Sequence, residues 1–167
     1  MRKVFLMGML SALLVMRIAI AGECRDALHP LLLSAAADTG QLQLVRTLCT
    51  DAYRDGDADA GYQLAIMDLG LDRWSPDTAI PLIREAADAG VPEAQYWLAW
   101  QYESGPLLPD DPAAALRWYE AAAAQEHRLA LQRLADVYAK GELGVMVNRL
   151  RATELRARAE RCARQAG

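Results

Sequence analysis

The sequence predicts an all-α protein, a right-handed α-solenoid of about three to four helix-turn-helix repeats. Three observations support this prediction. The hydrophobic residues, 53% of the chain, include many alanines and a single phenylalanine, and alanine favours helix. No run alternates between polar and apolar residues as a strand does. Similar segments also recur every 34 to 37 residues, a period typical of stacked helical pairs.

The repeat is clearest in three expected first helices: AGYQLAIMDLG from Ala60, AQYWLAWQYESG from Ala94 and ALQRLADVYAKG from Ala130. Each begins with alanine and has Leu-Ala at the fifth and sixth positions. The expected second helices follow in register: TAIPLIREAADAG from Thr78, AALRWYEAAAAQE from Ala114 and RATELRARAERCA from Arg151. Matching alanines should let neighbouring helices approach closely, while Trp118 and Tyr119 fill the wider space between successive pairs.

Turn residues mark the helix ends. Gly105 and Gly141 follow two of the first helices, where a helix end commonly needs a left-handed residue. Asp111 and Pro112 together predict the start of a second helix, because a capping carboxylate often precedes a first-turn proline.

The unit from Ala94 carries the pattern A-x-x-x-L-A-x-x-Y-x-x-G and then D-x-x-x-A-x-x-W-Y-x-x-A-A. The matching residues are Ala94, Leu98, Ala99, Tyr102, Gly105, Asp111, Ala115, Trp118, Tyr119, Ala122 and Ala123. This pattern resembles the SEL-type repeat, a relative of the tetratricopeptide repeat. The resemblance covers residues 56–162 and implies a binding scaffold, often periplasmic or secreted, with no common set of catalytic residues.

The flanking units depart from that pattern. The unit from Ala60 lacks the tyrosine and the Trp-Tyr pair. The last unit keeps Tyr138 and Gly141 but has Leu155 and Arg156 in place of the pair, as expected for a terminal cap.

The chain is expected to have three parts. Residues 1–21 read as a signal peptide, residues 22–55 as an N-terminal helical cap, and residues 56–167 as the repeat solenoid with a basic C-terminal helix. The cap segment PLLLSAAADTGQLQLVRTLCTDA looks like a degenerate helical pair and also somewhat like an ankyrin unit.

The signal peptide is inferred from its composition. Arg2 and Lys3 precede the apolar run VFLMGMLSALLVM, and small residues end at Ala21, where we expect cleavage. The mature protein would then be periplasmic or secreted. A retained membrane anchor is the alternative, although Arg17 interrupts the apolar run.

Export would place the three cysteines in an oxidising compartment. If residues 38–40 (DTG) form the turn of a helical hairpin, Cys24 comes within about one helical turn of Cys49. We therefore expect a Cys24–Cys49 disulfide. Cys162 would be left over as a small buried residue, or would compete for Cys49 if the solenoid curls.

Charge argues against nucleic-acid binding. The formal net charge is −4, and removing Arg2, Lys3 and Arg17 with the leader changes it to −7. The final helix is locally basic, with Arg149, Arg151, Arg156, Arg158, Arg161 and Arg164 against Glu154 and Glu160. This helix is expected to be a solvated capping face. The alternatives are a docking site for an acidic partner or for anionic lipid headgroups.

No enzyme is predicted. The only histidines are His29 and His127, and no serine or cysteine stands in a nucleophile motif beside either. We therefore predict no catalytic residues and no cofactor.

No metal site is predicted either. Asp55, Asp57 and Asp59 alternate like the start of a calcium loop, but Ala60 and Ile66 stand where that loop needs glycine and glutamate. These aspartates are expected to form an acidic turn that caps the next helix. The cysteine spacings give no zinc pattern.

A partner-binding surface is expected on the first helices. On a helical wheel, Trp100 points almost opposite the packing face formed by Ala94 and Leu98, and Trp97 also lies outside that face. For Trp97, burial in the core between repeats is the alternative. The expected partner-binding residues are Trp97, Trp100, Gln101, Tyr62, Gln63, Gln132, Arg133 and Asp136.

The sequence therefore predicts a non-catalytic scaffold or adaptor that binds another protein through a concave groove on its first helices. An immunity or inhibitor protein that neutralises an exported toxic enzyme is the alternative function. An envelope hydrolase is a third, disfavoured by the scarcity of histidine and nucleophile motifs.

Overall fold

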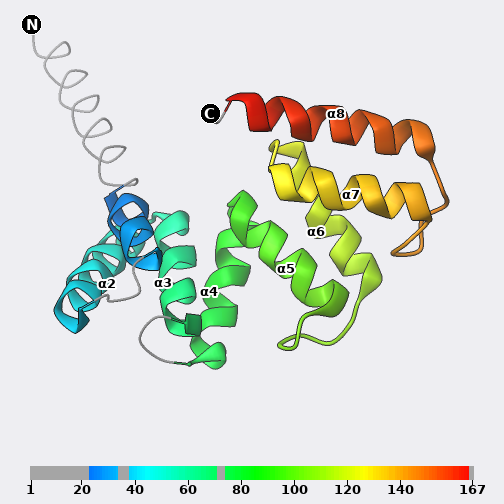
Figure 1. The fold of residues 1–167 in the computed structure, drawn as a ribbon. Coiled ribbons are helices and arrows are strands. Elements are labelled where there is room, and N and C mark those ends of the chain that lie inside the picture. The colour runs from blue at the N-terminus through cyan, green and yellow to red at the C-terminus, as the bar shows by residue number, and fades with distance from the viewer. Residues whose placement is uncertain (1–22, 34–37, 71–73, 166–167) are drawn as a thin grey trace, which may run out of the picture. The chain divides into compact units, whose positions relative to one another are not determined.

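The computed structural model describes residues 23–33, 38–70 and 74–165, and all regular secondary structure in these ranges is α-helical (Figure 1). This result confirms the predicted all-α fold. The predicted signal peptide lies outside the described residues. Among the residues that are described, no helix has both the length and the apolar character needed to cross a membrane.

The chain divides into two compact units, Met1–Leu82 and Ile83–Gly167. The division falls inside helix α4, Pro76–Asp88. The predicted boundary between an N-terminal cap ending at residue 55 and the repeats stays a prediction.

Unit Met1–Leu82 contains a helix at residues 23–32, then α2 (Thr39–Arg54), α3 (Ala58–Gly70) and the first part of α4. Its apolar core is built from Leu28, Leu42, Val45, Ala52, Ala60, Leu64 and Met67, together with two cysteines. Cys24 and Cys49 form a disulfide with a Cα–Cα distance of 4.9 Å, the pair that the hairpin register favours. The bond ties the first helix of this unit to α2.

Asp68 explains why the repeat in this unit lacks its tyrosine. Its side chain is buried, Arg46 Nη2 lies 2.8 Å from its Oδ1, and the Thr78 hydroxyl donates to its Oδ2 at 2.8 Å. A buried carboxylate is tolerated only when it is paired and hydrogen-bonded in this way. An ion pair thus takes the place that a tyrosine ring has in the two later repeats.

Unit Ile83–Gly167 contains the end of α4 and then α5 (Pro92–Ser104), α6 (Pro112–Ala124), α7 (Arg128–Lys140) and α8 (Arg149–Gln165), each packed on the next from α5 onward (Figure 1). Its core consists mostly of small residues: Ala99, Ala115, Ala122, Ala123, Ala130, Ala135 and Ala159, with Leu131, Leu134, Leu155 and Tyr119. Trp118 packs against this core and is half-buried. The predicted close approach of alanine-lined helices is confirmed.

One backbone hydrogen bond recurs in all three repeats. The residue that begins each second helix donates its N–H to a carbonyl near the end of the preceding first helix: Ser75 to Asp68 at 2.8 Å, Asp111 to Tyr102 at 2.8 Å, and Asn148 to Tyr138 at 2.7 Å. The same residues cap the later second helices, since Asp111 Oδ1 accepts from the Ala114 N–H and Asn148 Oδ1 from the Arg151 N–H. The positions that the sequence aligns between the three repeats are therefore also equivalent in the structure.

The two glycines at helix ends serve different purposes. Gly141 has φ 77°, in the left-handed region, as predicted. The same prediction is wrong for Gly105, whose φ is −77°. A Cβ at Gly105 would lie 2.5 Å from Gln101 Cα and would also overlap the Gln101 side chain. Glycine is required there for space, not for backbone conformation.

Gly105→Ala is therefore expected to lower the free energy of unfolding by about 1–3 kcal/mol, as overpacking does. Gly70→Ala is the matched control, because a Cβ added at Gly70 meets no atom within 4 Å. It should be neutral or slightly stabilising. Urea unfolding of both variants checks this, and equal effects would show that space at Gly105 is not limiting.

Candidate functional site

Trp100 is the most accessible of the aromatic residues expected to bind a partner. It lies on α5 with 42% of its surface exposed, and Trp97 on the same helix is half-buried. Gln132 on α7 is exposed. Tyr62 is half-buried on α3, in unit Met1–Leu82. The candidate surface on unit Ile83–Gly167 therefore centres on Trp100.

Two of the expected site residues are buried and do not belong to that surface. Gln101 is 2% exposed, and its Oε1 accepts a hydrogen bond from the Leu107 N–H at 3.0 Å. Gln63 is 7% exposed, and its Nε2 donates to Asp59 Oδ1 at 3.3 Å. Their amides satisfy polar groups of the chain itself, which a helical wheel does not reveal.

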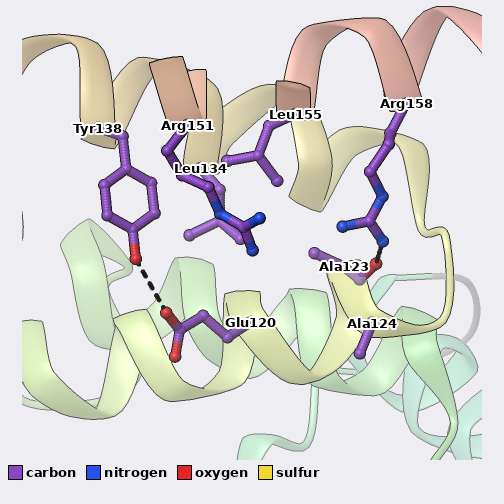
Figure 2. A pocket seen from close by; sticks show the side chains of 8 residues that line it. All are labelled: Glu120, Ala123, Ala124, Leu134, Tyr138, Arg151, Leu155 and Arg158. Carbon is purple, nitrogen blue, oxygen red and sulfur yellow. Dashed lines mark hydrogen bonds between the residues drawn. The ribbon is translucent and has the colours of Figure 1, made fainter. Parts of the chain in front are cut away.

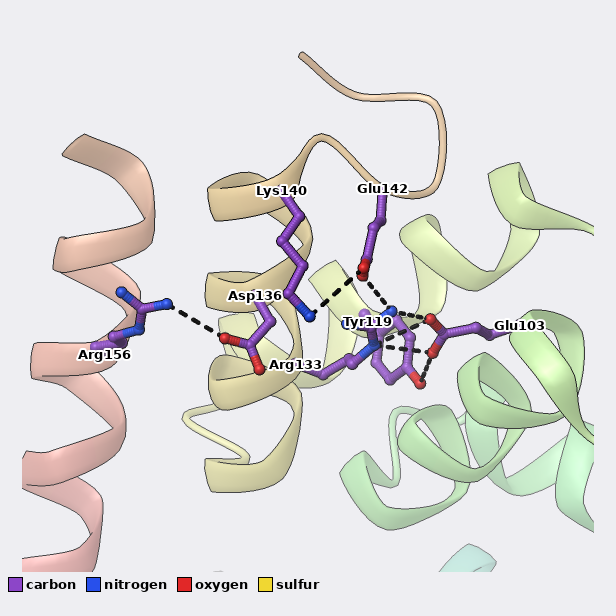
Figure 3. Close-up of polar contacts among 7 residues, drawn as sticks. All are labelled: Glu103, Tyr119, Arg133, Asp136, Lys140, Glu142 and Arg156. Atoms are coloured by element: carbon purple, nitrogen blue, oxygen red, sulfur yellow. Dashed lines mark hydrogen bonds and ion pairs between the residues drawn. The ribbon is translucent and has the colours of Figure 1, made fainter. Parts of the chain in front are cut away.

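Arg133 was expected to flank the tryptophans, but its guanidinium is engaged within the chain (Figure 3). Its Nε donates to Glu103 Oε1 at 2.9 Å and Oε2 at 3.1 Å, and its Nη2 also donates to Glu103 Oε1. Glu142 lies 2.7 Å from the same guanidinium, and Lys140 lies 3.6 Å from Glu142. Arg133 therefore links α5, α7 and the loop that follows α7.

Glu103 was not recognised from the sequence. It accepts a hydrogen bond from the Tyr119 hydroxyl at 2.7 Å as well as those from Arg133. Burial alone would raise the pKa of Glu103, but the hydrogen bonds from Arg133 and Tyr119 outweigh it and lower this pKa below its usual value. Burial and the bond to Glu103 raise the pKa of Tyr119. The cluster thus stays ionised at Glu103 and neutral at Tyr119.

The lowered pKa of Glu103 predicts a pH dependence of stability. The ionised Glu103 side chain contributes fully to the free energy of unfolding above its unfolded-state pKa, roughly 4.3. This contribution is lost as pH falls through the lower folded-state pKa. Glu103→Gln should reduce the free energy of unfolding by roughly 1.5–3 kcal/mol at pH 7 and by less below pH 4. Glu154→Gln is the control, since the Glu154 side chain is 56% exposed. Urea titrations at both pH values test this, and a loss for Glu103→Gln that does not shrink in acid would contradict it.

Asp136, the last of the expected residues, pairs with Arg156 of α8 at 3.2 Å (Figure 3). Both side chains are about half exposed, so the pair contributes little and can open. Asp136 therefore remains accessible to a partner, whereas the Arg133 guanidinium is already paired with Glu103 and Glu142.

The two histidines lie in different surroundings. His127 begins α7, where its Nδ1 accepts from the Ala130 N–H at 3.3 Å and its ring lies 4.9 Å from that of Tyr96. Burial lowers the pKa of His127. His29 is exposed on the first described helix. His127 therefore acts as a helix cap.

The acidic turn also has a structural role. Asp57 Oδ1 accepts from the Asp59 N–H at 3.0 Å where α3 begins. In the ranges that the structure describes, no three His, Cys, Asp or Glu side chains are grouped so that they could hold a metal ion. Cys162 on α8 is a half-buried free thiol, and its Sγ donates to the Glu126 carbonyl oxygen at 3.3 Å.

The helical pairs, their shared caps and the alanine core define a helical repeat solenoid. No protein-family model and no curated protein matches the sequence. Among solved structures, the chain is similar to a Sel1 repeat protein from Oxalobacter formigenes, with 32% identity and a TM-score of 0.64. That alignment covers 68% of this chain and 86% of the other. The chain therefore belongs to the Sel1 repeat family, the SEL-type repeat that its sequence resembles.

A second similar structure is a protective antigen present in uropathogenic Escherichia coli strains, which displays an SLR fold. The identity is 26%, the TM-score is 0.61, and the alignment covers 71% of this chain. It covers 26% of the antigen, so the chain spans about a quarter of that protein.

Proposed function

We propose that the chain is a non-catalytic scaffold that binds another protein outside the cytoplasm. The observation that carries this proposal is Trp100, whose large side chain is 42% exposed on a regular helix. Exposed tryptophans held by rigid elements are typical anchors of protein interfaces. Membership of a helical repeat family supports the proposal, because such repeats present extended binding surfaces.

The binding surface is the first-helix face of unit Ile83–Gly167. Trp100 and Trp97 of α5 form its aromatic part, and Gln132 and Asp136 of α7 supply polar groups. Their different exposures suit an anchor surrounded by weaker contacts. Arg133 supports this surface from within the chain by holding α7 to α5 through Glu103.

A location in the periplasm or outside the cell is supported by two features. The Cys24–Cys49 disulfide is of the kind that forms in oxidising compartments. The sequence of residues 1–21 has the charge and apolar pattern of a leader that is cleaved near Ala21. The antigen among the similar structures is consistent with such a location.

The test is an affinity pull-down from envelope extract of the producing cells with the mature chain as bait. Trp100→Ala should lose a specific protein partner, and Trp97→Ala should weaken its recovery. Trp74→Ala is the matched control, because Trp74 is 66% exposed and lies in the other unit. Circular dichroism confirms that each variant is folded. Retention of every partner by Trp100→Ala would refute the proposed surface.

The same experiment separates the proposed scaffold from an inhibitor. A scaffold should recover a partner without changing any catalytic activity of that partner. A single tightly bound enzyme that loses activity in the complex would show instead that the chain is an immunity or inhibitor protein.

A further inference from the structure

A cavity of about 170 Å³ lies between α6, α7 and α8 (Figure 2). Its apolar lining comes from Ala123 and Ala124 of α6, Leu134 of α7 and Leu155 of α8. The polar lining comes from Glu120 of α6, Tyr138 of α7, and Arg151 and Arg158 of α8. The cavity contains no residue of the Trp100 surface.

The repeat register explains why this space is open. Leu155 stands seven residues after the capping residue Asn148, as Trp118 stands seven residues after the capping residue Asp111. In α6 the tryptophan packs against the core. In α8 the much smaller leucine occupies the equivalent position beside the cavity. The last repeat therefore lacks a large aromatic side chain at the position where the previous repeat has one.

The two arginines at the cavity differ in how firmly they are held. Arg158 Nη2 donates to the Ala123 carbonyl oxygen at 2.7 Å and to Glu126 Oε1 at 2.8 Å, so its guanidinium is fixed. Among the described residues, the Arg151 guanidinium forms one ion pair, with Glu154 at 3.2 Å, and both side chains are about half exposed. Exposed pairs of this kind contribute little to stability. Arg151 can therefore exchange Glu154 for the carboxylate of a bound molecule.

The lining contains one carboxylate, that of Glu120. Glu120 accepts a hydrogen bond from the Tyr138 hydroxyl at 3.1 Å (Figure 2). Within the described ranges, it forms no ion pair with Arg151. The cavity thus combines an apolar floor with an available guanidinium at its edge.

We propose that this cavity is a second docking site for a protein partner. It takes an aromatic side chain from an acidic segment, and a neighbouring carboxylate of that segment pairs with Arg151. The aromatic ring supplies the bulk that Trp118 supplies in the previous repeat. The arginine-rich α8 matches the charge of such a segment. The proposal goes beyond binding at Trp100 and does not depend on it.

A short peptide tests the proposal directly. The probe is acetyl-Asp-Trp-Asp-amide, and its controls have alanine in place of tryptophan or lysine in place of both aspartates. NMR follows the methyl resonances of Leu134 and Leu155 in the full mature chain. The probe should shift both sets of resonances, whereas each control peptide should bind at least tenfold more weakly.

Three variants locate the peptide. Leu155→Trp restores the residue of the preceding repeat, should fill the cavity and should abolish the shift of the Leu134 methyl resonances, which remain observable in this variant. Arg151→Ala should weaken binding at least tenfold. Arg164→Ala is the matched control, because Arg164 is exposed on the same helix but does not line the cavity. This variant should bind the probe as tightly as the wild type does. If Leu155→Trp does not fold, the comparison of Arg151→Ala with Arg164→Ala decides.

Several outcomes would overturn the proposal. If a folded Leu155→Trp variant binds the probe like the wild type, the cavity is not the binding site. If Arg151→Ala and Arg164→Ala lose equal affinity for the probe, the peptide is attracted by the overall charge of α8 and not by Arg151. Failure of the probe to bind, together with binding of phosphatidylglycerol vesicles that Leu155→Trp leaves unchanged, would assign the arginines to a lipid surface. Self-association of the chain that Leu155→Trp abolishes, without probe binding, would assign the cavity to a second copy.

Discussion

Replacing Cys24 and Cys49 together by alanine should lower the free energy of unfolding of unit Met1–Leu82 by about 3.5 kcal/mol. The disulfide closes a loop with a sequence separation of 25, and a cross-link over a loop of this length restricts the unfolded chain by about that amount. Urea unfolding of the full chain measures the loss, and amide hydrogen exchange locates it. Exchange should accelerate in α2 and in the helix at residues 23–32.

The control for this experiment is Cys162→Ala. Cys162 is a free, half-buried thiol, so its replacement should change stability by less than about 1 kcal/mol. A reducing agent should reproduce the effect of the double replacement in the wild type and have no effect on the double variant. Unchanged exchange in α2 after loss of both cysteines would show that the disulfide does not stabilise this unit.

Tyr119→Ala should lower the free energy of unfolding by about 3–5 kcal/mol, the usual loss when a buried aromatic side chain is removed. Tyr119 is 1% exposed and is the largest fully buried side chain among the described residues. Its ring lies within the alanine core, 5.8 Å from that of Tyr96. The alanines around it are too small to fill the space that it would leave. Urea unfolding monitored by circular dichroism gives the magnitude.

Tyr119→Phe separates the ring from its hydroxyl. The ring would remain in the core, and only the hydrogen bond to Glu103 would be lost, at about 1.5 kcal/mol. A Tyr119→Phe variant as unstable as Tyr119→Ala would mean that the polar contact, not the packing of the ring, dominates at this position.

The fold could be predicted from the sequence because its signals are local and repeated. Ala94, Ala99 and Ala115 mark helix faces that must approach closely, and each recurs in another repeat. The cap at Asp111 follows from adjacent residues. The Cys24–Cys49 pair could be predicted because, once residues 38–40 are read as the turn of a helical hairpin, positions at similar distances before and after that turn face each other.

The candidate site was less predictable because it depends on pairs distant in sequence. Arg133 looks like a surface residue on a helical wheel, and its partner Glu103 is separated from it by 30 residues. Gln101 lies near the edge of the packing face, and its burial depends on the missing side chain at Gly105. Neither contact has a signature within its own helix. The aligned repeats could have revealed the substitution of Leu155 for tryptophan, but not the size of the cavity.

The most direct test of the proposed partner surface is photocrosslinking in intact producing cells. p-Benzoylphenylalanine is placed at Trp100 on α5 and, as the control, at Arg117, which is exposed on α6. We expect one discrete adduct with another protein from position 100 and none with that protein from position 117. The absence of an adduct at position 100, or the same adduct from both positions, would contradict binding through the first-helix face.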